Sequence, residues 1–254
     1  MKNRQEIREE MKSLLFQRED IIAVWEGGSV ATGFDDEYSD LDLSVICEDD
    51  QIETVYEFIT NYLENNFKII HQYRVPEPTW HGFSQCYYQT ANVPELFYFD
   101  IAFIKKSIRD KFTESDRHGE AFVWFQKEDL LDSTPTSDDV LIKKGKLFYQ
   151  KGIETFFLVD NSIQKYIKRN KFTEAFPAYY AFVARNLGIM LNLKYRPCKV
   201  DFGLLYGYRD YSFEDHQLIE NLFKVNNIEE LSQKYQIAKK RYCDLSEELK
   251  EKWL

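Results

Sequence analysis

Residues 21–47, IIAVWEGGSVATGFDDEYSDLDLSVIC, decide the fold of this chain. An apolar run from Ile21 to Trp25 ends at the turn Gly27-Gly28-Ser29, and a polar segment follows. From Asp40 to Val45, polar and apolar residues then alternate strictly. An apolar run bounded by glycines and a segment of period two both indicate β-strands. The stretch therefore predicts two strands joined by a loop that begins with glycines.

The polar residues of the second segment suggest a cation site. On a strand, Asp40, Asp42 and Ser44 share one face, while the apolar residues between them point into the core. Carboxylates side by side on a strand repel each other and disfavour folding. Mg²⁺ removes that cost and prefers oxygen ligands such as carboxylates, waters and phosphates. Because backbone at Gly28 and Ser29 can approach an anion closely, the stretch predicts a magnesium and phosphate site.

The same residues also resemble a known signature. Gly28-Ser29, ten intervening residues and Asp40-Leu41-Asp42 are similar to the motif of the DNA polymerase β-type nucleotidyltransferase superfamily. That superfamily usually has a third acidic residue on a neighbouring strand. Asp100 is the lone acid in the apolar stretch 96–104, so it matches this position.

The resemblance implies roles for these residues. Asp40, Asp42 and Asp100 would be catalytic and would bind two Mg²⁺ ions, and Gly28 and Ser29 would bind the triphosphate of the nucleotide. The implied reaction transfers a nucleoside monophosphate, AMP from ATP in the first instance, to a hydroxyl group and releases pyrophosphate. A basic residue of the C-terminal part would help to neutralise the triphosphate; the candidates are Lys143, Lys144, Lys146, Arg185 and Lys199.

Other interpretations of the three acids remain open. Asp40 and Asp42 could be solvated acids on an exposed strand face, and a buried Asp100 could cap a turn or pair with a lysine or arginine. The acceptor could be a protein side chain or an RNA end instead of a small molecule. The chain could also be a non-catalytic nucleotide-binding module on the same scaffold.

Bulk composition limits these alternatives. The chain has 254 residues, of which 44% are hydrophobic and 30% charged, as expected of a globular protein. Its formal net charge of −10 argues against a nucleic-acid partner and is compatible with a small cationic acceptor. The histidines and the four cysteines have no zinc-ligand spacing, and no apolar run reaches the length of a membrane span. We therefore expect a cytoplasmic protein that does not enter membranes.

The order of predicted elements gives the fold class. The expected strands are 21–25, 40–45, 67–73, 82–88, 96–104 and 121–125, the last of them short and buried. The expected helices are 7–15, 52–63, 140–167, 173–193, 213–223 and 228–254. This order predicts an α+β protein: a nucleotidyltransferase-type mixed sheet flanked by helices, then a C-terminal helical bundle.

The segment DSTPTSDD, residues 132–139, is the expected boundary because it is polar and rich in turn and capping residues. The prediction is a catalytic domain at 1–131 and a helical acceptor-binding domain at 138–254. Element order and size resemble those of small bacterial nucleotidyltransferases that modify aminoglycoside and lincosamide antibiotics. That resemblance implies an aminoglycoside-like acceptor, a role in antibiotic resistance, and a pocket that a homodimer could share.

Overall fold

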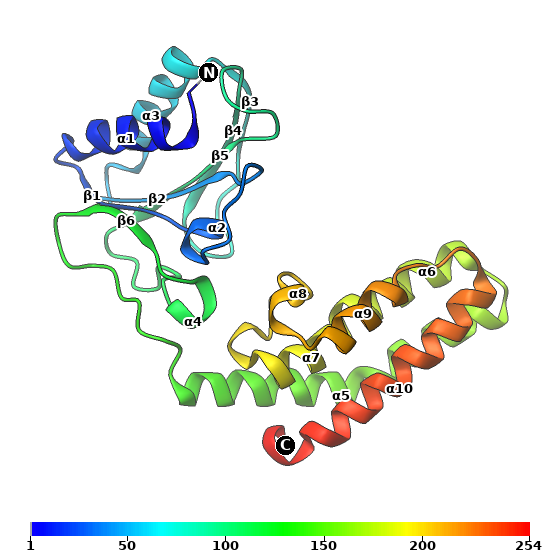
Figure 1. Ribbon diagram of the computed structural model, residues 1–254. Coiled ribbons are helices and arrows are strands. Elements are labelled where there is room, and N and C mark those ends of the chain that lie inside the picture. Colours follow the sequence, from blue (N-terminus) through cyan, green and yellow to red (C-terminus); the bar gives the residue numbers. More distant parts are fainter. Residues whose placement is uncertain (1) are drawn as a thin grey trace. The chain divides into compact units, whose positions relative to one another are not determined.

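The chain divides into two compact units, Met1–Pro135 and Thr136–Leu254, in a computed structural model that describes residues 2–254. Figure 1 shows the elements of each unit: strands and helices in the first, helices in the second. The division falls within the polar segment 132–139. Each unit has its own buried core.

The first unit is built on a mixed sheet of six strands in the order β3-β4-β5-β2-β1-β6. Its strands are β1 (Ile21–Glu26), β2 (Leu41–Cys47), β3 (Ile69–Arg74), β4 (Ser84–Thr90), β5 (Phe99–Lys105) and β6 (Phe122–Gln126). Among the strand pairs of residues 2–254, β2 pairs with β5 in parallel and the other four pairs are antiparallel. Helices α1 (Arg4–Phe16) and α3 (Ile52–Phe67) pack on the sheet, and α2 (Gly28–Ala31) and α4 (Ser115–His118) are single turns.

The period-two pattern of β2 separates a core face from a polar face. Leu41, Leu43 and Val45 are buried in one cluster with the apolar sides of α1 and α3. Asp42 and Ser44 lie on the opposite face and are only half-buried. The two helices thus cover one face of this part of the sheet and leave the carboxylate-bearing face open to a ligand.

Two strand predictions need correction. β5 begins at Phe99, not at 96: Leu96 has φ +71° and the Phe97 amide donates to the carbonyl of Pro94, so these residues form a turn. The strand predicted at 121–125 forms as β6, but it is not buried, since Phe122 and Val123 are 45% and 42% exposed. The reason is its place at the edge of the sheet, where it pairs with β1 alone.

The second unit is helical. Its helices are α5 (Asp138–Lys168), α6 (Phe172–Ala181), α7 (Gly188–Tyr195), α8 (Gly207–Asp210), α9 (Phe213–Leu222) and α10 (Ile228–Trp253). A π-helical segment, Phe182–Leu187, joins α6 to α7, so the helix predicted at 173–193 is continuous but not uniform. Its aromatic residues Tyr179 and Phe182 are buried against Tyr235 and Tyr242 of α10.

The predicted α+β class is confirmed: a mixed sheet with flanking helices precedes a helical region. Across residues 2–254, none of the helices has the length and hydropathy that a membrane crossing requires.

Candidate active site

The site begins where β1 ends. The amide of Gly27 donates to the backbone carbonyl of Asp42 at 2.9 Å, which holds the turn against β2. Gly28 has φ +56°, and a Cβ placed there would lie 1.8 Å from Oδ2 of Asp42. Only glycine fits both the backbone conformation and this close approach. The Gly-Gly-Ser turn is therefore built around the Asp42 carboxylate.

Strand register places the predicted acids together. Asp42 on β2 and Asp100 on β5 are direct partners in the parallel pairing, so their side chains share one face of the sheet. Asp40 precedes β2, and its Oδ1 accepts a hydrogen bond from the Tyr98 amide at 3.3 Å. Of the three acids that the sequence predicts beside the glycine turn, Asp42 and Asp100 thus lie in adjacent positions, and Asp40 lies one residue before β2 begins.

Burial and mutual repulsion shape the electrostatics of the acids. Desolvation, followed by the negative charge of Asp40, raises the pKa of Asp42. Desolvation also raises the pKa of Asp100 to about 6, with a smaller contribution from the charge of Asp42 and opposed by a hydrogen bond from Gln85. For Asp40, desolvation outweighs the hydrogen bond from Tyr98 and raises the pKa. Three carboxylates whose ionised forms are disfavoured are a suitable donor set for a bound cation.

A chain of hydrogen bonds orients Asp100. Nε2 of Gln85 donates to Oδ1 of Asp100 at 2.7 Å, and Oε1 of Gln85 lies 3.2 Å from Nε2 of His81. The Phe83 amide donates to Nδ1 of His81 at 3.0 Å. Because Nδ1 accepts, the proton of neutral His81 belongs on Nε2, where it faces the Gln85 carbonyl oxygen. His81 thereby fixes the amide of Gln85 so that its NH₂ group points at Asp100.

A pocket of about 380 Å³ opens in front of these residues. It is lined by Gly27, Gly28, Asp42, Leu43, Ser44, Trp80, His81, Phe83, Gln85, Tyr87, Asp100, Ala102, Phe112 and His118. No lysine or arginine is among these lining residues, and Asp42 and Asp100 are the acids among them. Its volume lies in the range of small-molecule sites, and Trp80 is 88% exposed at its rim.

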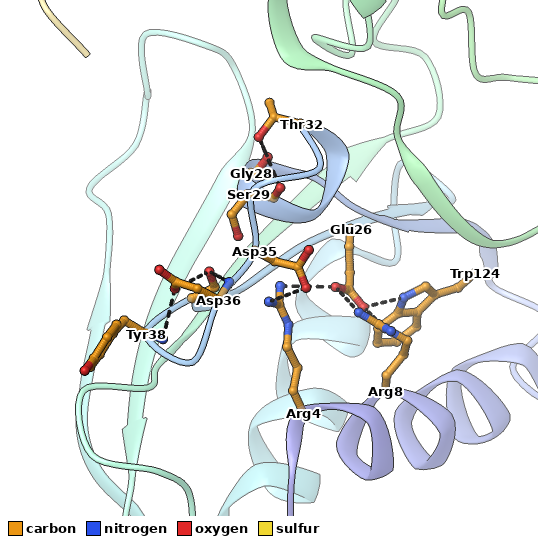
Figure 2. Close-up of polar contacts among 11 residues, drawn as sticks. Arg4, Arg8, Glu26, Gly28, Ser29, Thr32, Asp35, Asp36, Tyr38 and Trp124 are labelled. Carbon is orange, nitrogen blue, oxygen red and sulfur yellow. Dashed lines mark hydrogen bonds and ion pairs between the residues drawn. The ribbon is translucent and has the colours of Figure 1, made fainter. Parts of the chain in front are cut away.

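A buried ion-pair cluster lies at the end of β1, where the glycine turn begins. Glu26, the last residue of β1, is fully buried and pairs with Arg8 through both carboxylate oxygens. The indole N–H of Trp124 donates to the same carboxylate at 2.9 Å. Figure 2 shows Arg4 and Arg8 reaching from α1 toward Glu26, with the Gly28-Ser29 turn nearby. This cluster fixes the point at which the chain leaves β1 for the glycine turn.

Two polar groups near the turn have unused hydrogen-bonding capacity. Oγ of Ser29 is buried and makes no hydrogen bond within residues 2–254. Arg4 has two long ion-pair distances, 3.4 Å to Oε2 of Glu26 and 3.9 Å to Oδ2 of Asp35, and its Nε and Nη1 atoms are buried without a hydrogen bond in the same part of the chain. The positive charge of Arg4 also lowers the pKa of Asp42 against the upward effect of burial. Such donors are available to an anionic ligand.

The structure brings together only part of the predicted site. Gly28, Asp42 and Asp100 line the pocket, whereas Ser29 and Asp40 lie next to it. Within residues 2–254, no group of three His, Cys, Asp or Glu side chains is arranged to hold a metal ion. Two carboxylates suffice for Mg²⁺ when waters and substrate phosphates complete its coordination, so Asp42 and Asp100 still fit such an ion.

Sequence reasoning missed several residues of this site. Gln85 and His81 lie on or before β4 with no motif around them, and Arg4 is one of several charged residues in α1. The one available signal for Gln85 was the period of two along β4, which places it on the same face as Tyr87. Three of the lysines predicted to reach the triphosphate have other partners: Lys144 pairs with Asp201 at 2.8 Å, Lys146 donates to the carbonyl of Leu254 at 3.2 Å, and Lys199 lies 3.8 Å from Asp210.

Comparisons with known proteins add little to this description. No protein-family model matches the chain, and no curated protein matches it in sequence. Among solved structures it is similar to an aminoglycoside 6-adenyltransferase from Bacillus subtilis, with a TM-score of 0.39 and 14% sequence identity over 99% of this chain and 91% of that chain. A likeness at this score carries no weight for function, so the functional conclusion depends on the residues of the site.

Proposed function

We propose that this protein transfers a nucleoside monophosphate from a nucleoside triphosphate, ATP in the first instance, to a hydroxyl of a small molecule. The acceptor oxygen forms a bond to the α-phosphorus, and the bond from that phosphorus to the oxygen bridging to the β-phosphate breaks. Pyrophosphate leaves with the bonding electrons. The hydroxyl proton passes to the Asp100 carboxylate, directly or through a water.

The observation that carries this proposal is the pairing of Asp42 with Asp100 beside the Gly28 turn. Two half-buried carboxylates lie in register on adjacent strands, in a pocket lined by neither lysine nor arginine. Within residues 2–254, no hydrogen bond contributes to the raised pKa of Asp42, which desolvation and the charge of Asp40 set. A half-buried carboxylate without a hydrogen bond beside a second half-buried carboxylate favours a site for a divalent cation and its bound phosphates over a structural ion pair.

The remaining polar groups have complementary roles in the proposal. Asp40 would add a third carboxylate just before β2 begins, and Gly28 and Ser29 would bind the triphosphate through backbone amides and the buried hydroxyl. When bound, two Mg²⁺ ions would neutralise charge on the carboxylates and phosphates. We assign Arg4 as the residue that contacts the terminal phosphates, because its guanidinium has long ion pairs and two buried nitrogens without hydrogen bonds within residues 2–254.

The sequence resemblance names a candidate acceptor. It makes an aminoglycoside-like antibiotic the first compound to test, and with it a role in resistance. The acceptor-binding role of residues 138–254, the homodimer and the cytoplasmic location likewise stay predictions.

A pyrophosphate-release assay tests the proposal. The protein is incubated with Mg²⁺, each of the four common nucleoside triphosphates, and a panel of hydroxylated small molecules in which cationic compounds come first. We expect release that depends on both nucleotide and acceptor. Asp42→Asn should abolish it while the circular dichroism spectrum is unchanged, and Asp129→Asn, at an exposed carboxylate after β6, should leave it intact.

Three outcomes would contradict the proposal. Activity of Asp42→Asn within a few-fold of the parent would exclude the assigned role of that carboxylate. Incorporation of label from α-labelled ATP into RNA or protein instead of a small molecule would identify a macromolecular acceptor. Calorimetric binding of ATP and Mg²⁺ without release on any acceptor would favour a nucleotide-binding module.

A further inference from the structure

A second pocket, of about 440 Å³, lies on the open face of the sheet. Strands β3 and β4 and the turn before β5 form it, and its walls include Tyr73, Tyr87, Tyr98, Leu96 and His71. We call it the tyrosine pocket. All its lining residues belong to the first unit, and none of them has an assigned function.

The tyrosine pocket adjoins the candidate active site. Asp42 pairs with Asp100, Asp100 pairs with Tyr87, and Tyr87 pairs with Tyr73, so these residues form one row across four strands. Neighbouring strands are about 5 Å apart, so Tyr87 is one strand away from the acid that would accept the hydroxyl proton. Tyr87 lines both pockets and is the wall between them.

Aromatic faces dominate the surface that a ligand would meet. The rings of Tyr73 and Tyr87 are stacked, with centroids 6.5 Å apart and planes at 17°. Tyr98 continues the series, with its ring centroid 6.2 Å from that of Tyr87. Tyr73 is 58% exposed and Leu96 is 68% exposed, although both are large and apolar over most of their surface. Exposed apolar side chains gathered in a concave site are typical of a binding site.

Charge decides which ligand suits these rings. The residues that line the tyrosine pocket include no lysine or arginine, and the row leads to the carboxylates of Asp100 and Asp42. Tyrosine faces attract cations, most strongly quaternary or alkylated ammonium groups that shed water easily.

We propose that the tyrosine pocket binds the acceptor of the reaction, and that this acceptor is a hydroxyl-bearing ammonium compound whose cationic group rests on the tyrosine rings. The identification of this cation as the acceptor rests on the proposed function, whereas its binding in the tyrosine pocket does not. Its hydroxyl would point past Tyr87 toward Asp100, while the nucleotide occupies the pocket beside Gly28. Acceptor recognition would then reside in the first unit, whereas the sequence places it in residues 138–254.

A matched pair of probes tests the binding. Choline carries a hydroxyl and a quaternary ammonium group, and 3,3-dimethylbutan-1-ol has the same shape without the charge. We expect saturation-transfer difference NMR to give a Kd for choline at least fivefold lower than for the neutral alcohol. Tyr73→Ala should weaken choline binding about fivefold, whereas Tyr73→Phe, which keeps the ring, should bind as the parent does.

The controls separate this proposal from a general loss of structure. Because Tyr73 is largely exposed on the edge strand β3, its substitution should leave the melting temperature within about 2 °C of the parent. Tyr208→Ala, at an exposed tyrosine of the second unit, should leave choline binding unchanged. Addition of ATP and Mg²⁺ should not displace choline, since the two ligands would occupy different pockets.

Several results would overturn the proposal. These are no detectable choline binding, equal affinity for choline and the neutral alcohol, unchanged binding by Tyr73→Ala, or displacement of choline by ATP. Failure of the proposed function is distinguishable from these results. Pyrophosphate release can be absent while choline still binds through Tyr73, and release can occur with acceptors that Tyr73→Ala does not affect.

Discussion

The substitution Gly28→Ala tests the close approach of the glycine turn to Asp42. Alanine at φ +56° adopts the left-handed region, which costs about 1–2 kcal/mol for a residue with a side chain. Its Cβ would also lie 1.8 Å from Oδ2 of Asp42, whereas ordinary contact begins at 3.4 Å, so the two atoms must separate by 3.4 − 1.8 = 1.6 Å. The carboxylate can rotate away, so this second effect displaces a site residue and adds little to the loss of stability.

These two effects predict different sizes of change in stability and in activity. We expect the free energy of unfolding in urea to fall by about 1–2 kcal/mol, from the backbone strain alone. We expect kcat for pyrophosphate release to fall about 100-fold, since a misplacement of about 1 Å at reacting groups commonly has that effect.

Gly33→Ala is the matched control. Gly33 has φ +70°, but nothing lies within 4 Å of a Cβ placed there. The Gly33→Ala variant should therefore lose about 1–2 kcal/mol of stability, as Gly28→Ala does, and keep its activity within about threefold of the parent. Equal losses of activity in the two variants, or a Gly28→Ala enzyme with nearly full activity, would refute the argument from the contact with Asp42.

Three further predictions concern the acids and the groups that support them. The pKa of Asp100 is about 6 in the folded protein against an ordinary 3.8, so the native state binds the extra proton between these values. In EDTA, the free energy of unfolding should therefore fall by up to about 3 kcal/mol as the pH rises from about 4 to about 7, and Asp100→Asn should flatten this dependence in urea titrations. Gln85→Leu removes the 2.7 Å hydrogen bond to Asp100; steady-state kinetics should show kcat about tenfold lower with an unchanged KM for the nucleotide. Glu26→Gln leaves Arg8 half-buried without its charged partner, so urea unfolding should show a loss of about 3–5 kcal/mol.

Each of these predictions has an outcome that would contradict it. A pH profile of stability that Asp100→Asn does not alter would assign the dependence to other groups. An altered nucleotide KM in Gln85→Leu would show that this residue contacts the nucleotide and does not only orient Asp100. A loss below about 1 kcal/mol in Glu26→Gln would be typical of an exposed ion pair and not of the buried one seen here.

Local sequence patterns predicted most elements and part of the site. The alternation from Asp40 to Val45 predicted β2 and its polar face. The end of the apolar run before Gly27 predicted the turn that contains Gly28. The long helices α5 and α10 were predicted to within a few residues from their apolar periodicity. These features depend on residues close in the chain, where helical and strand periods leave a direct trace in the order of amino acids.

Other features could not be predicted in this way. The buried strand expected at 121–125 is an exposed edge strand, because its place in the sheet is set by pairing with β1. The hydrogen bond from Gln85 to Asp100, and the loose ion pairs of Arg4, likewise join residues that no motif connects.

The sequence alone determined that an acid-bearing strand follows a glycine turn, since both are properties of short segments. Only the tertiary structure decided that Asp100 pairs with Asp42 and Tyr87 with Asp100, and that a tyrosine-lined pocket continues the row. Asp40 and Tyr98 are 58 positions apart in the chain yet share a hydrogen bond. Register between such distant strands results from packing summed over the whole sheet, and no single segment encodes it.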